Sequence, residues 1–221
     1  MRPSAAPASG TVSGRMARPT SSPGTRSPAG PSDAALVVAA RAREGWAREA
    51  LFRRYAPLVN GLAYRLLGND GDVDDLVQDC FVQALESLER LGDPQAFVAW
   101  LQAVVVRTAS KRIRRQQLLR RLGLQRGEPV DIGRLVSREA PPDIAAELRA
   151  IYAIIDHLPA RVRVPLLLRR VEGHSLDEVA GLVGVSLATV KRRVAQGERY
   201  LEAILARSDA SAVEERTSHH A

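Results

Sequence analysis

The sequence predicts an all-α protein of two small helical domains that are joined by a flexible linker. From residue 33 onward, apolar residues recur at the three- and four-residue spacing of amphipathic helices, and no stretch alternates like a strand for a useful length. Glycines and prolines between residues 123 and 142 separate two such helical blocks. With 221 residues and 45% hydrophobic content, the chain has room for two compact cores.

Residues 1–32 are predicted to form a disordered tail. Pro, Ser, Ala, Gly and Thr dominate this segment, which contains four arginines and no acidic residue. Such a composition buries too little apolar surface to offset the entropy lost on ordering. Because the residues before Met16 show no structural signal, we also hypothesise that Met16 is an alternative translation start.

The first domain is predicted over residues 33–122. One apolar stripe runs from Leu51 to Leu66 and ends at the glycines of residues 68–71. A second stripe runs from Val73 to Leu88, and acidic residues occupy its first turn, where they suit the helix dipole.

A third helix begins with Asp93 as cap and Pro94 at its first position, and it becomes basic beyond its apolar face. Between Arg107 and Arg126 there are eight basic residues and no acid. This run is either a nucleic-acid-binding patch or a solvated, disordered helix end.

The second domain is predicted over residues 143–207, followed by a tail over 208–221. Its carboxyl half has the pattern of a helix-turn-helix, a motif that binds duplex DNA. Ser175 with Glu178 is typical of a capping box, and Gly184 supplies the positive φ of the turn. Ser186 can cap the second helix. The alternative is a simple helical hairpin whose arginines are solvated.

The acidic side of the second helix has two interpretations. Residues 70–75 are rich in aspartate, but the EF-hand pattern fails because Asp75 replaces the turn glycine and Phe81 replaces the bidentate glutamate. What remains is a solvated helix start or a docking surface for a basic partner. The periodicity of the sequence does not distinguish these two interpretations.

Composition and motifs exclude several classes of protein. The net charge is +7, supplied almost entirely by arginine, which suits contacts with phosphate. The one cysteine, Cys80, is expected in the core and forms no intrachain disulfide, which fits a reducing cytoplasm. No transmembrane segment or signal peptide is predicted, and no cofactor, metal-ligand spacing or catalytic motif is found.

The order of these parts resembles the extracytoplasmic-function sigma factors of bacterial RNA polymerase, over residues from about 34 to 206. Residues 51–57, 65–68, 72–81 and 97–101 are similar to the family's region two. Residues 158–161, 166–173 and 175–193 are similar to its region four. Agreement across two domains and a linker is more specific than either block alone.

This resemblance implies a function, partners and site residues. It implies an alternative sigma factor, not an enzyme, that joins core RNA polymerase and directs initiation at selected promoters, with no small-molecule substrate. An anti-sigma protein is a further implied partner, although no residue shows one. The polymerase would contact Asp72, Asp75, Gln78 and Asp79. The minus-ten element would face Arg107, Lys111, Arg112, Arg114 and Arg115. The minus-thirty-five element would face Thr189, Lys191, Arg192, Arg193 and Gln196.

The chain departs from the family pattern at three places. Lys111 reverses the charge of an aspartate usual on the third helix, and Pro165 is expected to kink its helix or displace the helix start. Residues 196–198 are less basic than usual. Two other function classes are alternatives: a helix-turn-helix regulator that acts without a polymerase holoenzyme, and a nucleic-acid enzyme with an appended DNA reader.

Overall fold

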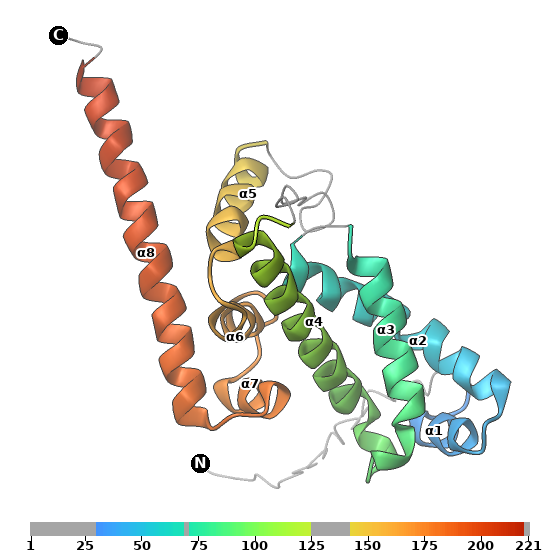
Figure 1. The fold of residues 1–221 in the computed structure, drawn as a ribbon. Helices are drawn as coiled ribbons and strands as arrows, with labels where there is room; N and C mark the ends of the chain where they lie inside the picture. Colours follow the sequence, from blue (N-terminus) through green and yellow to red (C-terminus); the bar gives the residue numbers. More distant parts are fainter. Residues whose placement is uncertain (1–29, 69–70, 125–141, 219–221) are drawn as a thin grey trace, which may run out of the picture. The chain divides into compact units, whose positions relative to one another are not determined.

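The computed structural model describes residues 30–68, 71–124 and 142–218, and the side chains as far as Arg207. Every regular element in these ranges is helical, as Figure 1 shows, which confirms the predicted fold class. Most of the predicted tail and linker, residues 1–29 and 125–141, lies outside the described residues. The elements are α1 (Asp33–Arg41), α2 (Gly45–Leu67), α3 (Val73–Glu86), η1 (Leu88–Arg90), η2 (Pro94–Ala96), α4 (Phe97–Arg121), α5 (Pro142–Asp156), α6 (Ala160–Arg170), α7 (Leu176–Val183) and α8 (Leu187–Ser218).

Helices α1 to α3 pack together on one side of α4. Arg54 and Tyr55 of α2 both donate hydrogen bonds to the carboxylate of Asp33, which fixes the start of α1 against α2. Phe52, expected in the apolar stripe of α2, is 45% exposed, although its ring contacts that of Phe81. Cys80 is fully buried in this core, as predicted, and burial raises the pKa of its thiol to about 11.

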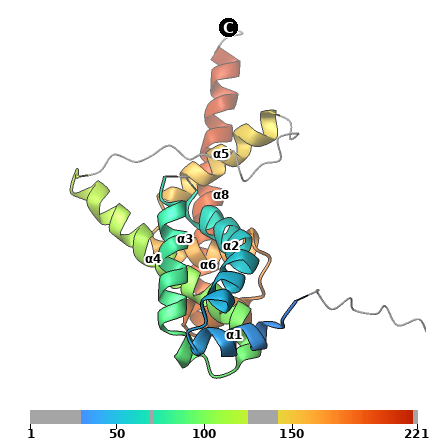
Figure 2. The same cartoon turned by 90° about the vertical axis from the view of Figure 1, so that its right-hand side faces the viewer.

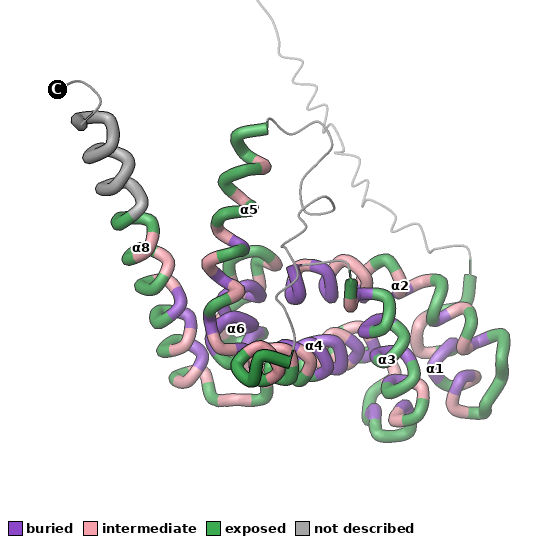
Figure 3. The backbone as a smooth tube through the Cα atoms, turned by 45° about the horizontal axis from the view of Figure 1, so that its top comes forward, coloured by how far each residue is buried: buried purple, intermediate pink, exposed green. Residues whose placement is uncertain are grey.

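Helix α4 is buried on two sides. Val104, Val105 and Val106 are all buried, and three successive residues of an α-helix point in directions about 100° apart. Helices α2 and α3 cover one side of α4, while α6 and α7 cover another. Figures 1 and 3 show α4 between these groups with its middle turns buried, and in Figure 2 α1 to α3 lie in front of α6 and α8.

The two helical groups therefore share one continuous apolar core, which the sequence did not predict. The pattern of two apolar blocks predicted two cores joined by a flexible linker, because helical periodicity shows which residues are apolar but not which helix covers them. Within residues 32–221 the structure packs the blocks on each other.

In the second group, two expectations about helix ends change. Pro165 lies inside α6, among its buried residues, so the helix start is not displaced to the proline. Helix α8 continues to Ser218, so the first eleven residues of the predicted tail are helical.

In the first group, the helix predicted to begin at Pro94 starts as the short 3₁₀ turn η2, which Asp93 caps as predicted. Helix α4 itself begins at Phe97.

Candidate nucleic-acid interface

The predicted helix-turn-helix forms from α7 and α8, with the expected local geometry. The Ser175 hydroxyl accepts a hydrogen bond from the Glu178 amide at 3.2 Å, and the Glu178 carboxylate accepts one from the Ser175 amide at 2.7 Å. Gly184 has φ +68°, and its amide donates to the Ala180 carbonyl, which closes α7. Ser186 caps α8 by accepting from the Thr189 amide at 3.3 Å.

The first turns of α8 have one buried and one accessible face. Val190, Val194 and Gly197 are buried at the spacing of one helix face. The predicted minus-thirty-five set lies on the other sides: Lys191, Arg192 and Gln196 are exposed, whereas Thr189 and Arg193 are half-buried. The structure thus brings all five residues together on the start of one helix, as a major-groove reader requires.

Two residues after this set have structural roles that the sequence did not reveal. A Cβ atom on Gly197 would lie 2.9 Å from Leu166 Cδ2 of α6, so the glycine permits α8 to approach α6 closely. Glu198 accepts hydrogen bonds from the Arg170 guanidinium of α6. The absence of a basic residue at positions 197 and 198 therefore reflects contacts with α6.

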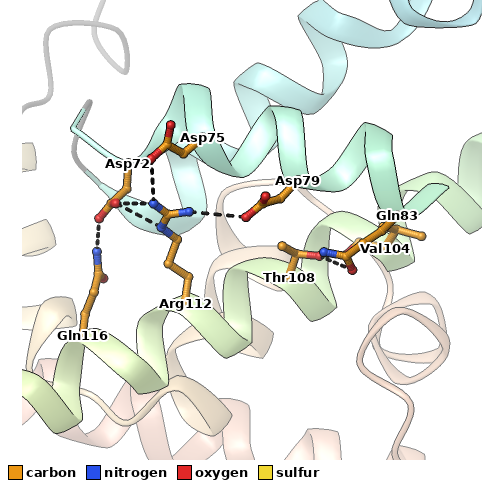
Figure 4. A network of polar contacts seen from close by, with 8 residues as sticks. All are labelled: Asp72, Asp75, Asp79, Gln83, Val104, Thr108, Arg112 and Gln116. Carbon is orange, nitrogen blue, oxygen red and sulfur yellow. Dashed lines mark hydrogen bonds and ion pairs between the residues drawn. The ribbon is translucent and has the colours of Figure 1, made fainter. Parts of the chain in front are cut away.

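The predicted minus-ten set on α4 divides into two parts. Arg107, Lys111, Arg114 and Arg115 are exposed. Arg112 is different, since its side chain is only 22% exposed and points toward α3. Figure 4 shows it at the centre of a network that joins α3 and α4.

This network pairs residues that had been expected to serve different partners. The Arg112 guanidinium donates to Asp72 through Nε at 3.0 Å and through Nη2 at 2.5 Å, and Gln116 donates to the other carboxylate oxygen. It also lies 3.3 Å from Asp75 and 3.6 Å from Asp79. Burial alone would lower the pKa of Arg112, but the hydrogen bonds to Asp72 and Asp75 and the charges of these two carboxylates outweigh it and raise the pKa.

The acidic face of α3 that remains accessible is smaller than predicted. Asp72 is largely occupied by Arg112, whereas the side chains of Asp75 and Asp79 are 74% and 59% exposed. Gln78 is also exposed, and Val82, one turn further along this face, is 48% exposed. This face thus combines two carboxylates, an amide and an apolar side chain.

Comparisons with known families agree with this geometry. The family described as Sigma-70 region 2 matches residues 51–118, which include α3 and most of α4. The family described as Sigma-70, region 4 matches residues 148–201, which include the helix-turn-helix. The chain belongs to the sigma-70 family.

Similar curated proteins include sigma factors of the extracytoplasmic-function (ECF) group. The ECF RNA polymerase sigma factor SigE of Mycolicibacterium smegmatis is 31% identical over 164 residues, which are 71% of this chain and 61% of that protein. The chain therefore spans less than two thirds of this relative. The ECF RNA polymerase sigma-E factor of Haemophilus influenzae is 28% identical over 77% of this chain and 94% of that factor.

Two solved structures share the sigma factor fold. CnrH in complex with the cytosolic domain of CnrY aligns with a TM-score of 0.52 and 25% identity, covering 79% of this chain and 97% of that one. The sigma factor RpoE of Bartonella quintana, solved with the anti-sigma factor NepR, aligns with a TM-score of 0.53 and 21% identity, covering 71% and 95%. Within the described ranges, no helix has the length and apolarity needed to cross a membrane.

Proposed function

We propose that this ECF sigma factor binds core RNA polymerase through region two and directs transcription initiation at promoters that both regions read. The observation that carries the proposal is the coexistence, in one chain, of an exposed acidic face on α3 and a basic DNA-reading helix in α8. Opposite charges suit these surfaces to different partners: a basic protein surface for the first and DNA phosphates and base edges for the second.

The site assignments follow from exposure. For core polymerase we assign Asp75, Gln78 and Asp79, with Asp72 orienting the face through Arg112. For the minus-ten element we assign the exposed basic residues of α4: Arg107, Lys111, Arg114 and Arg115. For the minus-thirty-five element we assign Thr189, Lys191, Arg192, Arg193 and Gln196.

The remaining parts of the proposal concern partners and setting. The polymerase performs the chemistry, so the sigma factor needs no catalytic residues of its own and acts in the cytoplasm beside the polymerase. The complex of RpoE with NepR supports an anti-sigma protein as a further partner. We also propose residues 33–122 as the limits of the region-two domain and residues 143–207 as the limits of the region-four domain. A regulator that acts without core polymerase is the less favoured alternative, since it has no need of the acidic face.

The test is run-off transcription with purified core polymerase and a promoter library. We expect promoter-specific transcripts only when core enzyme and this chain are both present. Absence of any specific transcript would discard the sigma assignment in favour of a regulator.

A charge reversal on α3 tests the polymerase contact. Asp75→Arg is expected to weaken association with core polymerase at least tenfold, because it places a cation against a basic partner. Asp74→Arg is the matched control: it has the same charge change in the same first turn, but it projects about 100° away around the helix. Both variants should retain wild-type helicity, and equal co-purification of both with core enzyme would contradict the assignment.

A further inference from the structure

The carboxyl end of α4 presents large apolar side chains to water. Leu118, Leu122 and Leu124 are 57%, 60% and 72% exposed. Figure 2 shows the last turns of α4 extending past α3. Leucine is usually buried, and neighbouring exposed apolar side chains mark a site of interaction. The function proposed above uses none of these three residues.

This end of the helix has a defined structure. Gly123 has φ +69°, and the amide of the next residue, Leu124, donates to the Leu119 carbonyl at 2.9 Å. This bond is typical of a Schellman cap, which folds the chain back over the last turn of a helix. Leu124 therefore stays close to that turn. We call Leu118, Leu122 and Leu124 together the leucine tip.

The leucines of α4 face away from its packed side. Gln117 donates to the Leu158 carbonyl at 2.8 Å and Arg120 donates to the Asp156 carboxylate, so contacts occupy that side of the helix. Successive residues of an α-helix differ by about 100°, which places Leu118 about 100° from Gln117 and about 160° from Arg120. The leucine tip is therefore accessible to a partner from outside.

Cationic side chains flank the leucine tip on both sides. By the same helical geometry, Arg114 and Arg121 lie on one side of Leu118 and Arg115 lies on the other, each within about 60°. All three arginines are exposed, and α4 contains no acidic residue. Leucines between cations suit a partner that is both anionic and apolar.

The surface of an anionic lipid bilayer fits this description best. A DNA duplex is anionic, but it buries leucine only where base steps are forced apart. A second copy of the tip would bring like charges together, which is unfavourable. At a bilayer surface, leucines enter the boundary between headgroups and acyl chains while arginines reach the lipid phosphates.

We propose that the leucine tip and its three flanking arginines bind the anionic surface of a lipid bilayer. The guanidinium groups pair with lipid phosphates, and the leucines leave water for the acyl chains. Salt screens the contribution of the cations, so the leucines should supply most of the binding that persists at high ionic strength.

Co-flotation of the full chain with lipid vesicles tests the proposal. Vesicles of equal parts phosphatidylglycerol and phosphatidylcholine should bind the wild-type chain, whereas vesicles of phosphatidylcholine alone should not. Leu118→Ser/Leu122→Ser should weaken binding to the anionic vesicles about tenfold or more, without any change in charge. Val38→Ser is the matched control and should bind like wild type, because Val38 lies on α1 and is 59% exposed.

Three results of this experiment would overturn the proposal. A wild-type chain that does not bind the anionic vesicles would leave the leucine tip to a protein partner. Equal binding by the double-serine variant and by Val38→Ser would show that the net charge of +7 alone attracts the chain. A double-serine variant that loses affinity for promoter DNA but not for vesicles would assign the tip to the DNA interface.

Charge reversal tests the flanking cations. Arg121→Glu should weaken binding to the anionic vesicles about fivefold or more, because repulsion replaces the attraction of one cation. Arg199→Glu makes the same change in net charge at an exposed position of α8 and should have a smaller effect. Equal losses in the two variants would contradict a local role for the arginines of the tip.

A tryptophan placed in the tip locates the contact with lipid. The emission of Leu122→Trp should shift to shorter wavelength when anionic vesicles are added, because the new indole ring leaves water. Val38→Trp is the control and should show no shift beyond that of the wild-type chain, which contains Trp46 and Trp100. Equal shifts in the two variants would contradict the tip as the contact site.

Lipid and promoter should compete for α4, because Arg114 and Arg115 are also assigned to the minus-ten element. This consequence rests on the proposed function. Anionic vesicles should reduce run-off transcription by the wild-type chain more than by the double-serine variant, and equal losses would contradict the competition. Flotation does not depend on transcription. Vesicle binding as expected, without promoter-specific transcripts even in the absence of vesicles, would therefore refute the proposed function alone.

Discussion

Arginine residues serve two opposite purposes in this sigma factor. Arg192 and Arg107 present exposed guanidinium groups, whereas Arg163 is buried and Arg112 lies in a network of carboxylates. An exposed guanidinium remains available for phosphates and base edges, while a buried one must be paired because unpaired buried charge is strongly unfavourable. Exposed and paired arginines look alike in the sequence. Only the carboxylates and carbonyls that surround each one in the structure distinguish the two kinds.

The arginines that we propose to face the major groove give a prediction at this scale. Arg192→Ala and Arg193→Ala should each lose about 1 to 3 kcal/mol of binding to a minus-thirty-five duplex if the guanidinium pairs with a base. Fluorescence anisotropy at fixed salt measures the loss. Arg199→Ala is the control, since Arg199 is exposed further along α8 and bonds the Ala195 carbonyl. If the guanidinium instead contacts a phosphate, the variant should mainly show a weaker salt dependence of binding. Unchanged affinity and unchanged salt dependence in both variants would contradict the placement of these arginines.

At the scale of elements, the position of the reading helix depends on α6. Helix α8 lies against α6 through Gly197, and the Arg170–Glu198 pair links the same two helices. Since α8 carries on its first turns the residues that we propose to read bases, this contact with α6 affects the angle at which they are presented. Residues outside the proposed DNA-binding set thereby help to position that set.

Two glycine-to-alanine variants should change stability in opposite directions. Gly197→Ala places a Cβ atom 2.9 Å from Leu166 Cδ2 and should destabilise the fold by about 1 kcal/mol, because overpacking exceeds the gain in helix propensity. Gly181→Ala, in α7 with nothing within 4 Å, should stabilise by about 0.5 to 1 kcal/mol. Urea unfolding of both variants provides the measurement. If Gly197→Ala instead raised the free energy of unfolding, the side chains of α6 would have to accommodate the added Cβ atom without destabilising the fold.

At the scale of the whole molecule, Asp156 couples region four to region two. Burial alone would raise the pKa of its carboxyl, but the hydrogen bond from Arg120 and the charges of Arg163 and Arg120 outweigh it, so the pKa is lowered. A lowered pKa means that the folded state binds the proton less readily than the unfolded chain. The stabilisation is therefore fully present above the unfolded pKa near 3.8 and is lost as the pH falls through the folded value.

Acid unfolding tests this coupling. At pH 7, Asp156→Asn should be less stable by on the order of 3 kcal/mol, because Arg163 remains buried without its carboxylate. The difference from wild type should shrink as the pH falls from about 4 to 2, since the wild-type carboxyl becomes protonated. Free energies of unfolding from denaturant titrations at several pH values measure it. Curves that stay parallel would exclude Asp156 as the linked group.

The sequence alone determined the local parts of this protein: an all-α fold, the caps and turn of the helix-turn-helix, and the family, because these depend on residues close together in the chain. Tertiary structure decided which charges stay accessible and how the blocks pack. Arg112 pairs with Asp72 across 40 positions, and Arg163 reaches Leu67 across 96. Helical periodicity marks a face as apolar or charged, but the partner of that face is set by contacts between distant segments.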